Sequence, residues 1–330
     1  MEHYIRESQS KHSVQAAPTQ TGAGTIYLVK TPTLGVWDIY TPQNYIYVGD
    51  HMVREVRAGS LMLARILVYS SIYLALGAAI VAISTMFISN YPLVWYLPLI
   101  PFAGSFLIYN LNRLTDMDED IINVYDRAQF SKRFGKVLLY LAGPLYAACL
   151  FLAYQRNIYT LAIALMPLLI ALLYSIARLK KFLFLKNVLV AMAWGCSALL
   201  VAAYFTNLNI VLVCLYIFFS LQFLINVIIF DIKDARGDKY QGINSLPLKL
   251  GIAKTKEACL LIFIPLLIVW VLLLSSTIRA IILLPFLIYT ATFVLAAGDK
   301  RPWWYYGVFV DGEFFTILLA LLLWWAAWQI

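Results

Sequence analysis

Nine apolar segments recur between residues 62 and 329, and each is about long enough to cross the hydrocarbon core of a bilayer as a helix. Hydrophobic residues make up 62% of the 330 residues, and charged residues make up 13%. A soluble globular protein has roughly a quarter of its residues charged. The sequence therefore predicts an all-α, polytopic membrane protein with nine transmembrane helices. We expect these helices near residues 62–88, 92–111, 135–154, 158–178, 185–204, 207–230, 256–275, 279–297 and 312–329.

Residues 1–60 precede the first apolar segment and differ from it in composition. Residues 1–24 are rich in Gln, Ser, Thr and Gly, which predicts no fixed structure there. Residues 25–48 carry Tyr and Trp side chains of the kind that lie at headgroup depth. We therefore expect an N-terminal polar and interfacial segment, residues 1–60, followed by a transmembrane domain, residues 61–330.

The positive charges lie between the apolar segments, although the net charge of +8 could by itself suggest nucleic acid. Of the 25 Lys and Arg residues, only Arg156 and Arg279 fall in the short connections on one side of the predicted membrane, and the other 23 lie on the opposite side. Cytoplasmic loops carry an excess of Lys and Arg. We expect a multi-pass protein of the cell membrane with a cytoplasmic N-terminus and no role in nucleic-acid binding.

A first array of polar side chains, Asn112, Asp116 and Asp120, follows the second apolar segment at the spacing i, i+4, i+8. These positions lie along one face of a helix. Ionisable groups at membrane depth are energetically expensive and indicate function. Oxygen ligands of this kind suit Mg²⁺, which usually binds through one or two carboxylates together with substrate phosphates. The spacing predicts that these three side chains are metal ligands.

A second array, Asp231, Asp234 and Asp238, follows the sixth apolar segment and lies on one face if that helix continues beyond residue 230. The orientation predicted above puts both arrays on the same side of the membrane. Their charges would repel strongly unless cations lay between them. Two Mg²⁺ ions and a pyrophosphate satisfy this balance. We expect Mg²⁺ as the cofactor and all three aspartates of this second array as metal ligands. We expect four of the aspartates in the two arrays to be catalytic, namely Asp116, Asp120, Asp234 and Asp238.

Basic residues flank the two arrays, and phosphate contact is expected for Arg113, Lys181 and Lys239. Arginine contacts phosphate through two parallel hydrogen bonds, and lysine acts as a point charge. Asp311 is interpreted as an N-cap with Glu313 in the first turn of the last helix, and not as a catalytic residue. Five other basic residues are attributed to membrane topology alone: Lys132, Arg133, Lys186, Lys254 and Lys256.

These residues resemble the motifs of the UbiA superfamily of intramembrane prenyltransferases. Asn112-Arg-Leu-Thr-Asp116-Met-Asp-Glu-Asp120 is similar to the first acidic motif of that family, with Asn123 and Arg127 downstream. Asp231-Ile-Lys-Asp234-Ala-Arg-Gly-Asp238 is similar to the second. The segment between the fourth and fifth predicted spans resembles the family's Tyr-Ser and basic connection through Tyr174, Ser175, Lys180, Lys181 and Asn187. The resemblance covers roughly residues 60–330.

The resemblance implies a helical bundle around a central cavity with a cytoplasmic cap. It implies that Mg²⁺ bridges the two acidic motifs and the diphosphate of a polyprenyl donor, and that the prenyl group passes to an electron-rich acceptor while pyrophosphate leaves. Together with the charges beside the arrays, it marks as diphosphate-binding residues Arg113, Arg127, Tyr174, Ser175, Lys180, Lys181 and Lys239.

Three questions stay open at the level of sequence. The acceptor can be aromatic, such as a quinone precursor, or a glycerol or sugar phosphate. An intramembrane terpene cyclase would use the same metal site without an acceptor. A transporter is the remaining alternative, although transport sites usually lie near the bilayer midplane on broken helices.

Overall fold

The computed structural model describes residues 16–21, 24–30, 37–40, 62–176 and 184–327. The chain divides into two compact units, Met1–Gly59 and Ser60–Ile330. The second unit contains all the apolar segments.

In the first unit, three strands form an antiparallel sheet in the order β1-β2-β3. They are β1 (Ala16–Thr21), β2 (Gly24–Lys30) and β3 (Trp37–Tyr40). Pro18 pairs with Tyr27, and Val29 pairs with Asp38. The expectation that residues 1–24 lack fixed structure is therefore wrong for β1. This strand is poor in β-forming residues, and it is ordered by pairing with β2, a partner that composition does not reveal.

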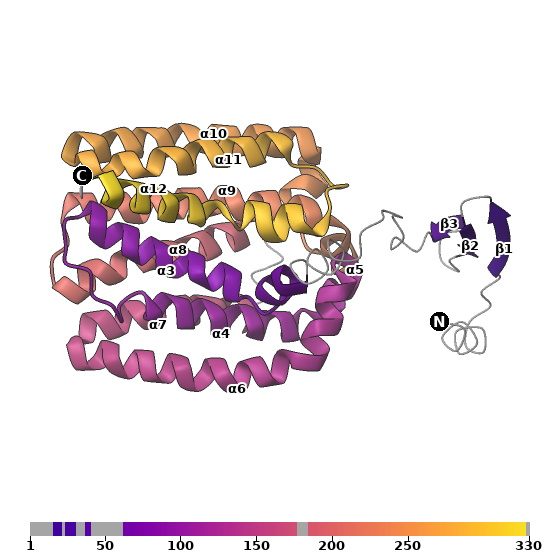
Figure 1. Ribbon diagram of the computed structural model, residues 1–330, viewed down its shortest axis with the longest axis horizontal. Coiled ribbons are helices and arrows are strands. Elements are labelled where there is room, and N and C mark those ends of the chain that lie inside the picture. Colours follow the sequence, from indigo (N-terminus) through magenta and orange to yellow (C-terminus); the bar gives the residue numbers. More distant parts are fainter. Residues whose placement is uncertain (1–15, 22–23, 31–36, 41–61, 177–183, 328–330) are drawn as a thin grey trace. The chain divides into compact units, whose positions relative to one another are not determined.

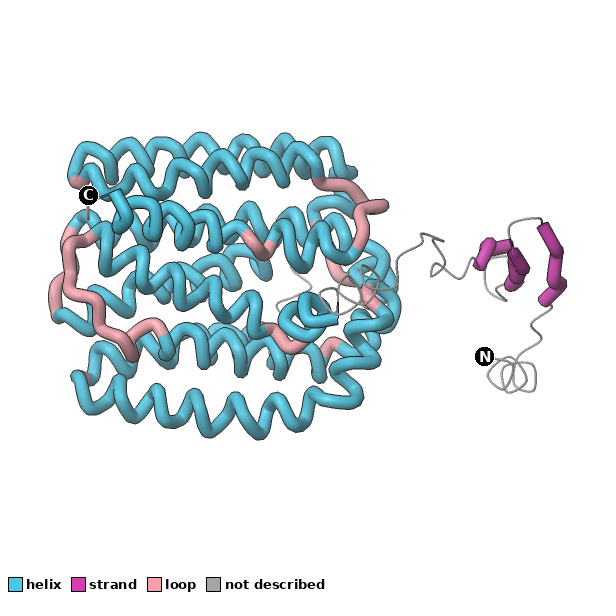
Figure 2. Tube along the Cα trace, viewed as in Figure 1, coloured by secondary structure: helices cyan, strands magenta, loops and turns pink. Residues whose placement is uncertain are grey.

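Every element described from residue 62 onward is helical, and this confirms the all-α class for the second unit. Figure 1 shows these helices lying side by side along a common direction, and Figure 2 shows the short loops that join most of them. A short helix, Met62–Tyr69, comes first. The elements after it are α3 (Ile72–Ile88), α4 (Leu99–Thr115), α5 (Met117–Asn123), α6 (Tyr125–Arg156), α7 (Ile158–Ile176), α8 (Leu185–Phe205), α9 (Ile210–Tyr240), α10 (Leu246–Ser276), η2 (Ile278–Leu283), α11 (Leu284–Ala296), η3 (Tyr305–Val310) and α12 (Glu313–Ala327).

The described residues contain fewer membrane-spanning helices than the nine predicted. Each predicted segment is at least partly helical, but only six helices in the described part of the chain are long and apolar enough to cross a membrane on their own. A seventh span is possible if Met62–Tyr69 and α3, which meet at a bend of 66°, count as one. Helix α4, with 17 residues, and the apolar helix Ile158–Leu173 within α7 are shorter than these six. Nine spans is thus more than the helices show.

Helix α9 is the central element of the helical unit. Of its most apolar stretch, 67% is buried, against 22% for the peripheral helix α6. It packs along α8 on one side and α10 on another. Aromatic side chains fill the core around it, among them Phe218, Phe219, Phe286 and Phe314. Packing on several sides therefore fixes the position of α9 and of the polar residues that it carries.

Candidate active site

The first acidic motif lies at a break between two helices. Helix α4 ends at Thr115 and α5 begins at Met117, with Asp116 between them. The backbone N–H of Asp116 donates to the Asn112 carbonyl at 2.8 Å, and the N–H of Asp120 donates to the Asp116 carbonyl at 3.1 Å. The expectation of one unbroken helical face is therefore wrong, but helical hydrogen bonding continues across the break and keeps the three residues on the same side.

The second acidic motif lies on a single helix, as expected for a helix that continues past residue 230. Helix α9 runs without interruption to Tyr240, so Asp231, Asp234 and Asp238 share one face of it. The chain turns away at Gly242, whose φ of +66° is readily adopted by glycine. Of the three carboxylates, Asp231 and Asp238 are buried and Asp234 is partly buried.

The two motifs meet across one polar cavity of about 260 Å³. They are separated by more than a hundred residues, and α5 packs directly against α9. The cavity wall contains Asn112 and six aspartates, namely Asp116, Asp120, Asp231, Asp234, Asp238 and Asp311. It also contains four cations, namely Arg113, Arg127, Lys186 and Lys233. Carboxylates and cations thus face the same space.

Asp120 and Arg127 form a two-point ion pair in this wall. The guanidinium Nε donates to Asp120 Oδ2 at 3.1 Å, and Nη2 donates to Oδ1. Both side chains are largely enclosed, so the pair is shielded from water. Hydrogen bonds of this geometry are the strong, charge-assisted kind. Asp120 therefore positions Arg127, and its oxygens keep further lone pairs for a metal ion.

Lys186, at the start of α8, bridges two carboxylates of the second motif. Its Nζ lies 2.8 Å from Asp231 Oδ1 and 3.3 Å from Asp238 Oδ2. The neighbouring Asn187 donates to Asp231 Oδ2 at 2.8 Å. Both oxygens of Asp231 are therefore engaged by α8. The interpretation of Lys186 as a residue of membrane topology alone is therefore incomplete, because its side chain lies in the site.

Two enclosed polar atoms in the wall have no hydrogen-bond partner among the described residues. Asp234 Oδ1 accepts no hydrogen bond, although Lys233 Nζ lies 3.4 Å away. Arg113 donates from Nη2 to the Val68 carbonyl at 2.9 Å, but its Nη1 donates to nothing. Buried polar groups are normally satisfied. These two atoms are thus suited to bind a cation and an anion, respectively.

The donors in the cavity wall suit a metal ion that shares its ligands with a substrate. Within the described residues, no three His, Cys, Asp or Glu side chains converge on one position that could hold a metal ion. Mg²⁺ is, however, usually bound by one or two carboxylates with substrate phosphates completing its shell. Asp234 Oδ1, which accepts no hydrogen bond, and the all-oxygen character of the acidic motifs fit that mode. The residues present therefore fit Mg²⁺ in company with a phosphate ligand.

The predicted diphosphate-binding residues fall into three groups. Arg113 and Arg127 line the polar cavity. Lys239 is exposed and does not line it, because Lys239 points away from the face of α9 that carries the aspartates. The side chains of Tyr174 and Ser175, and the whole of Lys180 and Lys181, lie outside the described residues. Lys186 and Lys233 occupy the cavity where Lys239 was expected.

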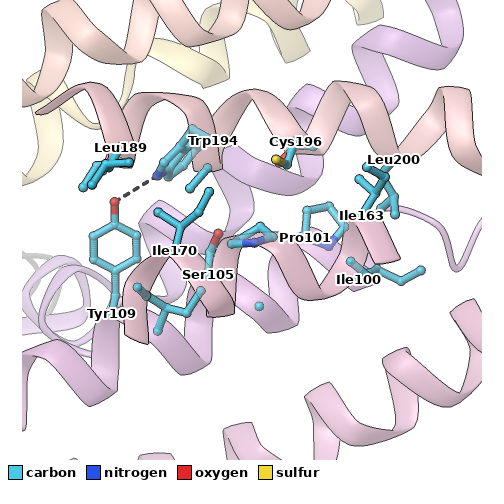
Figure 3. Close-up of a pocket in the computed structure, with 18 of the residues that line it drawn as sticks. Ile100, Pro101, Ser105, Tyr109, Ile163, Ile170, Leu189, Trp194, Cys196 and Leu200 are labelled. Atoms are coloured by element: carbon cyan, nitrogen blue, oxygen red, sulfur yellow. Dashed lines mark hydrogen bonds between the residues drawn. The ribbon is translucent and has the colours of Figure 1, made fainter. Parts of the chain in front are cut away.

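A second, apolar cavity of about 140 Å³ adjoins the polar one. It runs between α4, α7 and α8 and is lined by side chains such as Ile100, Ile163 and Leu200, as Figure 3 shows. At its polar end, Trp194 Nε1 donates to the Tyr109 hydroxyl at 2.9 Å. Tyr109, Asn112, Asp116 and Val190 line both cavities. The site therefore joins a charged compartment to an apolar one.

Asn123 joins the two motif segments, and this contact gives a first prediction. Its Oδ1 accepts a hydrogen bond from the Gly237 backbone N–H at 2.9 Å, and a Cβ at Gly237 would lie 2.3 Å from Asn123 Nδ2. Gly237→Ala should push Asn123 off α9, destabilise the protein by about 1–3 kcal/mol and lower turnover. Thermal unfolding in detergent measures this. Gly143→Ala is the control, because a Cβ there meets nothing within 4 Å, and equal stability of the two variants would contradict the prediction.

Fold and site together define a multi-pass, membrane-embedded protein whose charged cavity opens onto an apolar one. The chain belongs to the UbiA prenyltransferase family, whose sequence model matches residues 72–304, more than half of its length. It is an integral membrane prenyltransferase, as the resemblance of the acidic motifs implies. A comparison with curated proteins gives no match.

Two solved structures share this fold. A UbiA homologue from Archaeoglobus fulgidus bound to GPP and Mg²⁺ is 14% identical with a TM-score of 0.58, and the match covers 78% of this chain and 99% of that one. The apo structure of a UbiA homologue from Aeropyrum pernix K1 is 16% identical with a TM-score of 0.54, and the match covers 78% of this chain and 96% of that one. At these identities the likeness shows the fold.

Proposed function

We propose that this protein transfers a prenyl group from a polyprenyl diphosphate to a small acceptor within the membrane, with Mg²⁺ as cofactor and pyrophosphate as the leaving group. The observation that carries the proposal is the junction of the two cavities. A prenyl diphosphate has a charged head and a long apolar tail, and the polar and apolar cavities offer one compartment for each. Membership of the family supplies the reaction type.

The charges of the polar cavity support a role for Mg²⁺. Six aspartates face four Lys and Arg side chains, so the wall carries more negative than positive charge before any diphosphate enters. A diphosphate adds further negative charge, and uncompensated charges of one sign at these distances repel strongly. Divalent cations between the aspartates and the diphosphate restore the balance. The Archaeoglobus fulgidus relative, with GPP and Mg²⁺ bound together, supports the same combination.

The ligands that we assign to Mg²⁺ come from both motifs. Asn112 and Asp116 supply oxygens from the first, and Asp234 and Asp238 supply them from the second. Asp120 and Asp231 can add oxygens through the lone pairs that their protein partners leave free. When bound, Mg²⁺ neutralises the charge that develops on the departing pyrophosphate.

The cationic side chains stabilise the same leaving group directly. Arg113 has an enclosed Nη1 without a partner, and Arg127 is held in orientation by Asp120. Lys186 and Lys233 lie among the aspartates of the second motif. As the bond between the prenyl C1 and the diphosphate oxygen breaks, these donors meet the charge that accumulates on that oxygen. Pre-positioned donors of this kind in a water-poor site lower the barrier effectively.

Aromatic side chains surround the junction where the prenyl C1 would lie. Tyr109 lines both cavities, and the ring of Trp194 stacks on that of Phe223 with centroids 3.9 Å apart. Aromatic faces stabilise nearby cations. They also keep water from an allylic cation until the acceptor captures it. This aromatic wall favours an aromatic acceptor, such as a quinone precursor, over a glycerol or sugar phosphate.

The distribution of Lys and Arg supports the orientation of the site. Under the predicted topology, 23 of the 25 basic residues, including those of the N-terminal segment, lie on the side of the acidic motifs, which favours that side as cytoplasmic in the cell membrane. The polar cavity would then bind the diphosphate head of the donor and release pyrophosphate on the cytoplasmic side.

Purified full-length protein in detergent tests the proposal with geranyl, farnesyl and geranylgeranyl diphosphates as donors. Pyrophosphate release is expected with Mg²⁺ and should disappear when EDTA removes the metal, because the aspartates then repel the donor. A panel of phenolic and glycerol-phosphate acceptors, with radiolabelled donor, identifies the product. A cyclic hydrocarbon formed without any acceptor would favour a terpene cyclase, and no pyrophosphate from any donor would refute the proposal.

A further inference from the structure

Asp311 lines the polar cavity but belongs to neither acidic motif. Asp311 follows the π-helical turn η3 and precedes α12, and it is only 9% exposed. Short π-helical segments are rare and are frequently found at functional sites. The sequence suggested a simple helix cap, and the structure instead places this carboxylate in the wall of the cavity.

The charged and titratable groups around Asp311 come from every neighbouring element. Arg113 of α4, Arg127 of α6 and Lys233 of α9 interact with it electrostatically. Tyr73 of α3, Tyr109 of α4 and Glu313 of α12 are its titratable neighbours. The Asp311 carboxylate nevertheless makes no hydrogen bond and no ion pair with any residue that the structure describes. Asp120, Asp231 and Asp238 in the same wall each have a cation within ion-pair distance.

The backbone around Asp311 is held tightly. A Cβ at Gly312 would lie 2.3 Å from the Val308 carbonyl oxygen and 2.7 Å from the Tyr73 hydroxyl. The next residue, Glu313, is fully buried and accepts hydrogen bonds from Gln222 at 2.6 Å and Asn226 at 2.8 Å, both on α9. The start of α12 is therefore fixed to the central helix. Asp311 keeps its place in the cavity without needing a side-chain partner of its own.

We propose that Asp311 is the catalytic base that accepts the proton released by the acceptor substrate; the inference rests on the proposed function. In the balanced step, the C1–O bond of the donor breaks and its electron pair leaves with the diphosphate. A nucleophilic carbon or oxygen of the acceptor forms a bond to C1, and its proton passes to an Asp311 oxygen. Each turnover releases one proton in a site that excludes water, so a nearby group must receive it.

The position of Asp311 suits this role better than that of a counterion. A counterion for Arg113, Arg127 or Lys233 would place an oxygen within ion-pair distance of one of them, and Asp311 does not. Aspartates that bind Mg²⁺ are poor proton acceptors, because the metal holds their electron pairs. Asp311 interacts electrostatically with Tyr109, which lines both cavities, and we therefore place it on the side where an acceptor meets the prenyl C1.

The test compares Asp311→Asn and Asp311→Ala with the wild type in the acceptor assay described above. Binding of a prenyl diphosphate with Mg²⁺, measured by quenching of tryptophan fluorescence, should change less than threefold in either variant. Transfer to the acceptor should fall by about 10²–10⁴-fold. Added formate should restore part of the transfer in Asp311→Ala, because a small carboxylate can enter the space and accept the proton. Asp299→Asn, which removes an exposed carboxylate outside the cavity, serves as the matched control.

The outcomes separate this inference from the function on which it rests. A wild type that releases no pyrophosphate refutes the proposed function itself. With an active wild type, near-normal transfer by Asp311→Asn overturns the role of Asp311. A loss of donor binding as large as the loss of transfer also overturns it, since that pattern is the one expected of a counterion. Retained binding, lost transfer and rescue by formate support it.

Discussion

Replacing Asp234 by asparagine is expected to abolish Mg²⁺-dependent pyrophosphate release while the protein stays folded. Asp234 Oδ1 is enclosed in the polar cavity without a hydrogen-bond partner, which makes it a well-placed oxygen for a metal ion. A metal that polarises a phosphoryl group contributes several kcal/mol to transition-state stabilisation. Since about 1.4 kcal/mol corresponds to a tenfold change in rate, the loss should reach about 10³-fold.

A matched control for Asp234→Asn lies in the other acidic segment. Asp118 is exposed and does not line the cavity, so Asp118→Asn removes one carboxylate near the site without touching its wall. This variant should release pyrophosphate at close to the wild-type rate. Titration with Mn²⁺, followed by electron paramagnetic resonance, should show weaker metal binding in Asp234→Asn alone. Wild-type turnover in Asp234→Asn would remove this residue from the metal site.

Glu313→Gln is expected to give a large loss of stability. The two Glu313 oxygens accept from different donors: Oε2 from Gln222 and Oε1 from Asn226, and Thr290 lies 3.5 Å from Oε2. Glutamine offers a single acceptor oxygen, so with Gln222 and Asn226 in their present orientations its amide nitrogen faces a second N–H donor inside the bundle. Leaving a buried donor unpaired costs about 1–3 kcal/mol, and the contact between two donors adds to it.

The free energy of unfolding of Glu313→Gln can be measured by titration with denaturing detergent. Glu257→Gln, an exposed position on α10, provides the comparison, because the same chemical change there leaves no buried group unpaired. The Glu313 variant should unfold at clearly lower denaturant, and the Glu257 variant should not. Indistinguishable unfolding curves would show that the carboxylate does not fasten α12 to α9.

The helical class and the shared acidic face of α9 were predictable from the sequence, because both depend on local patterns. Long apolar runs predict helices whatever their neighbours are, and Asp231, Asp234 and Asp238 share a face on any helix that continues past residue 230. The structure brings these three residues to the same cavity as Asn112 and Asp116.

Other parts of the site depend on contacts between distant elements and so could not be predicted. Lys186 looks like any basic residue between two spans, and only the packing of α8 on α9 brings it between Asp231 and Asp238. Asp311 has the sequence signature of a helix cap, and only the π-helical turn before it places it in the cavity. Lys239 lies next to Asp238 in the chain but is exposed, because adjacent helical residues point in different directions.

The short boundary formed by Tyr109, Asn112, Asp116 and Val190 has a consequence for any amphiphile that enters. At this boundary the surroundings of a bound molecule change from charged to mainly apolar. Moving an ionised head group to the apolar end would leave it without solvation or partners, and this is very unfavourable. An amphiphile therefore binds in one orientation, with its charged head in the polar cavity and its apolar tail in the apolar one. Polarity alone sets this orientation, before any bond is made or broken.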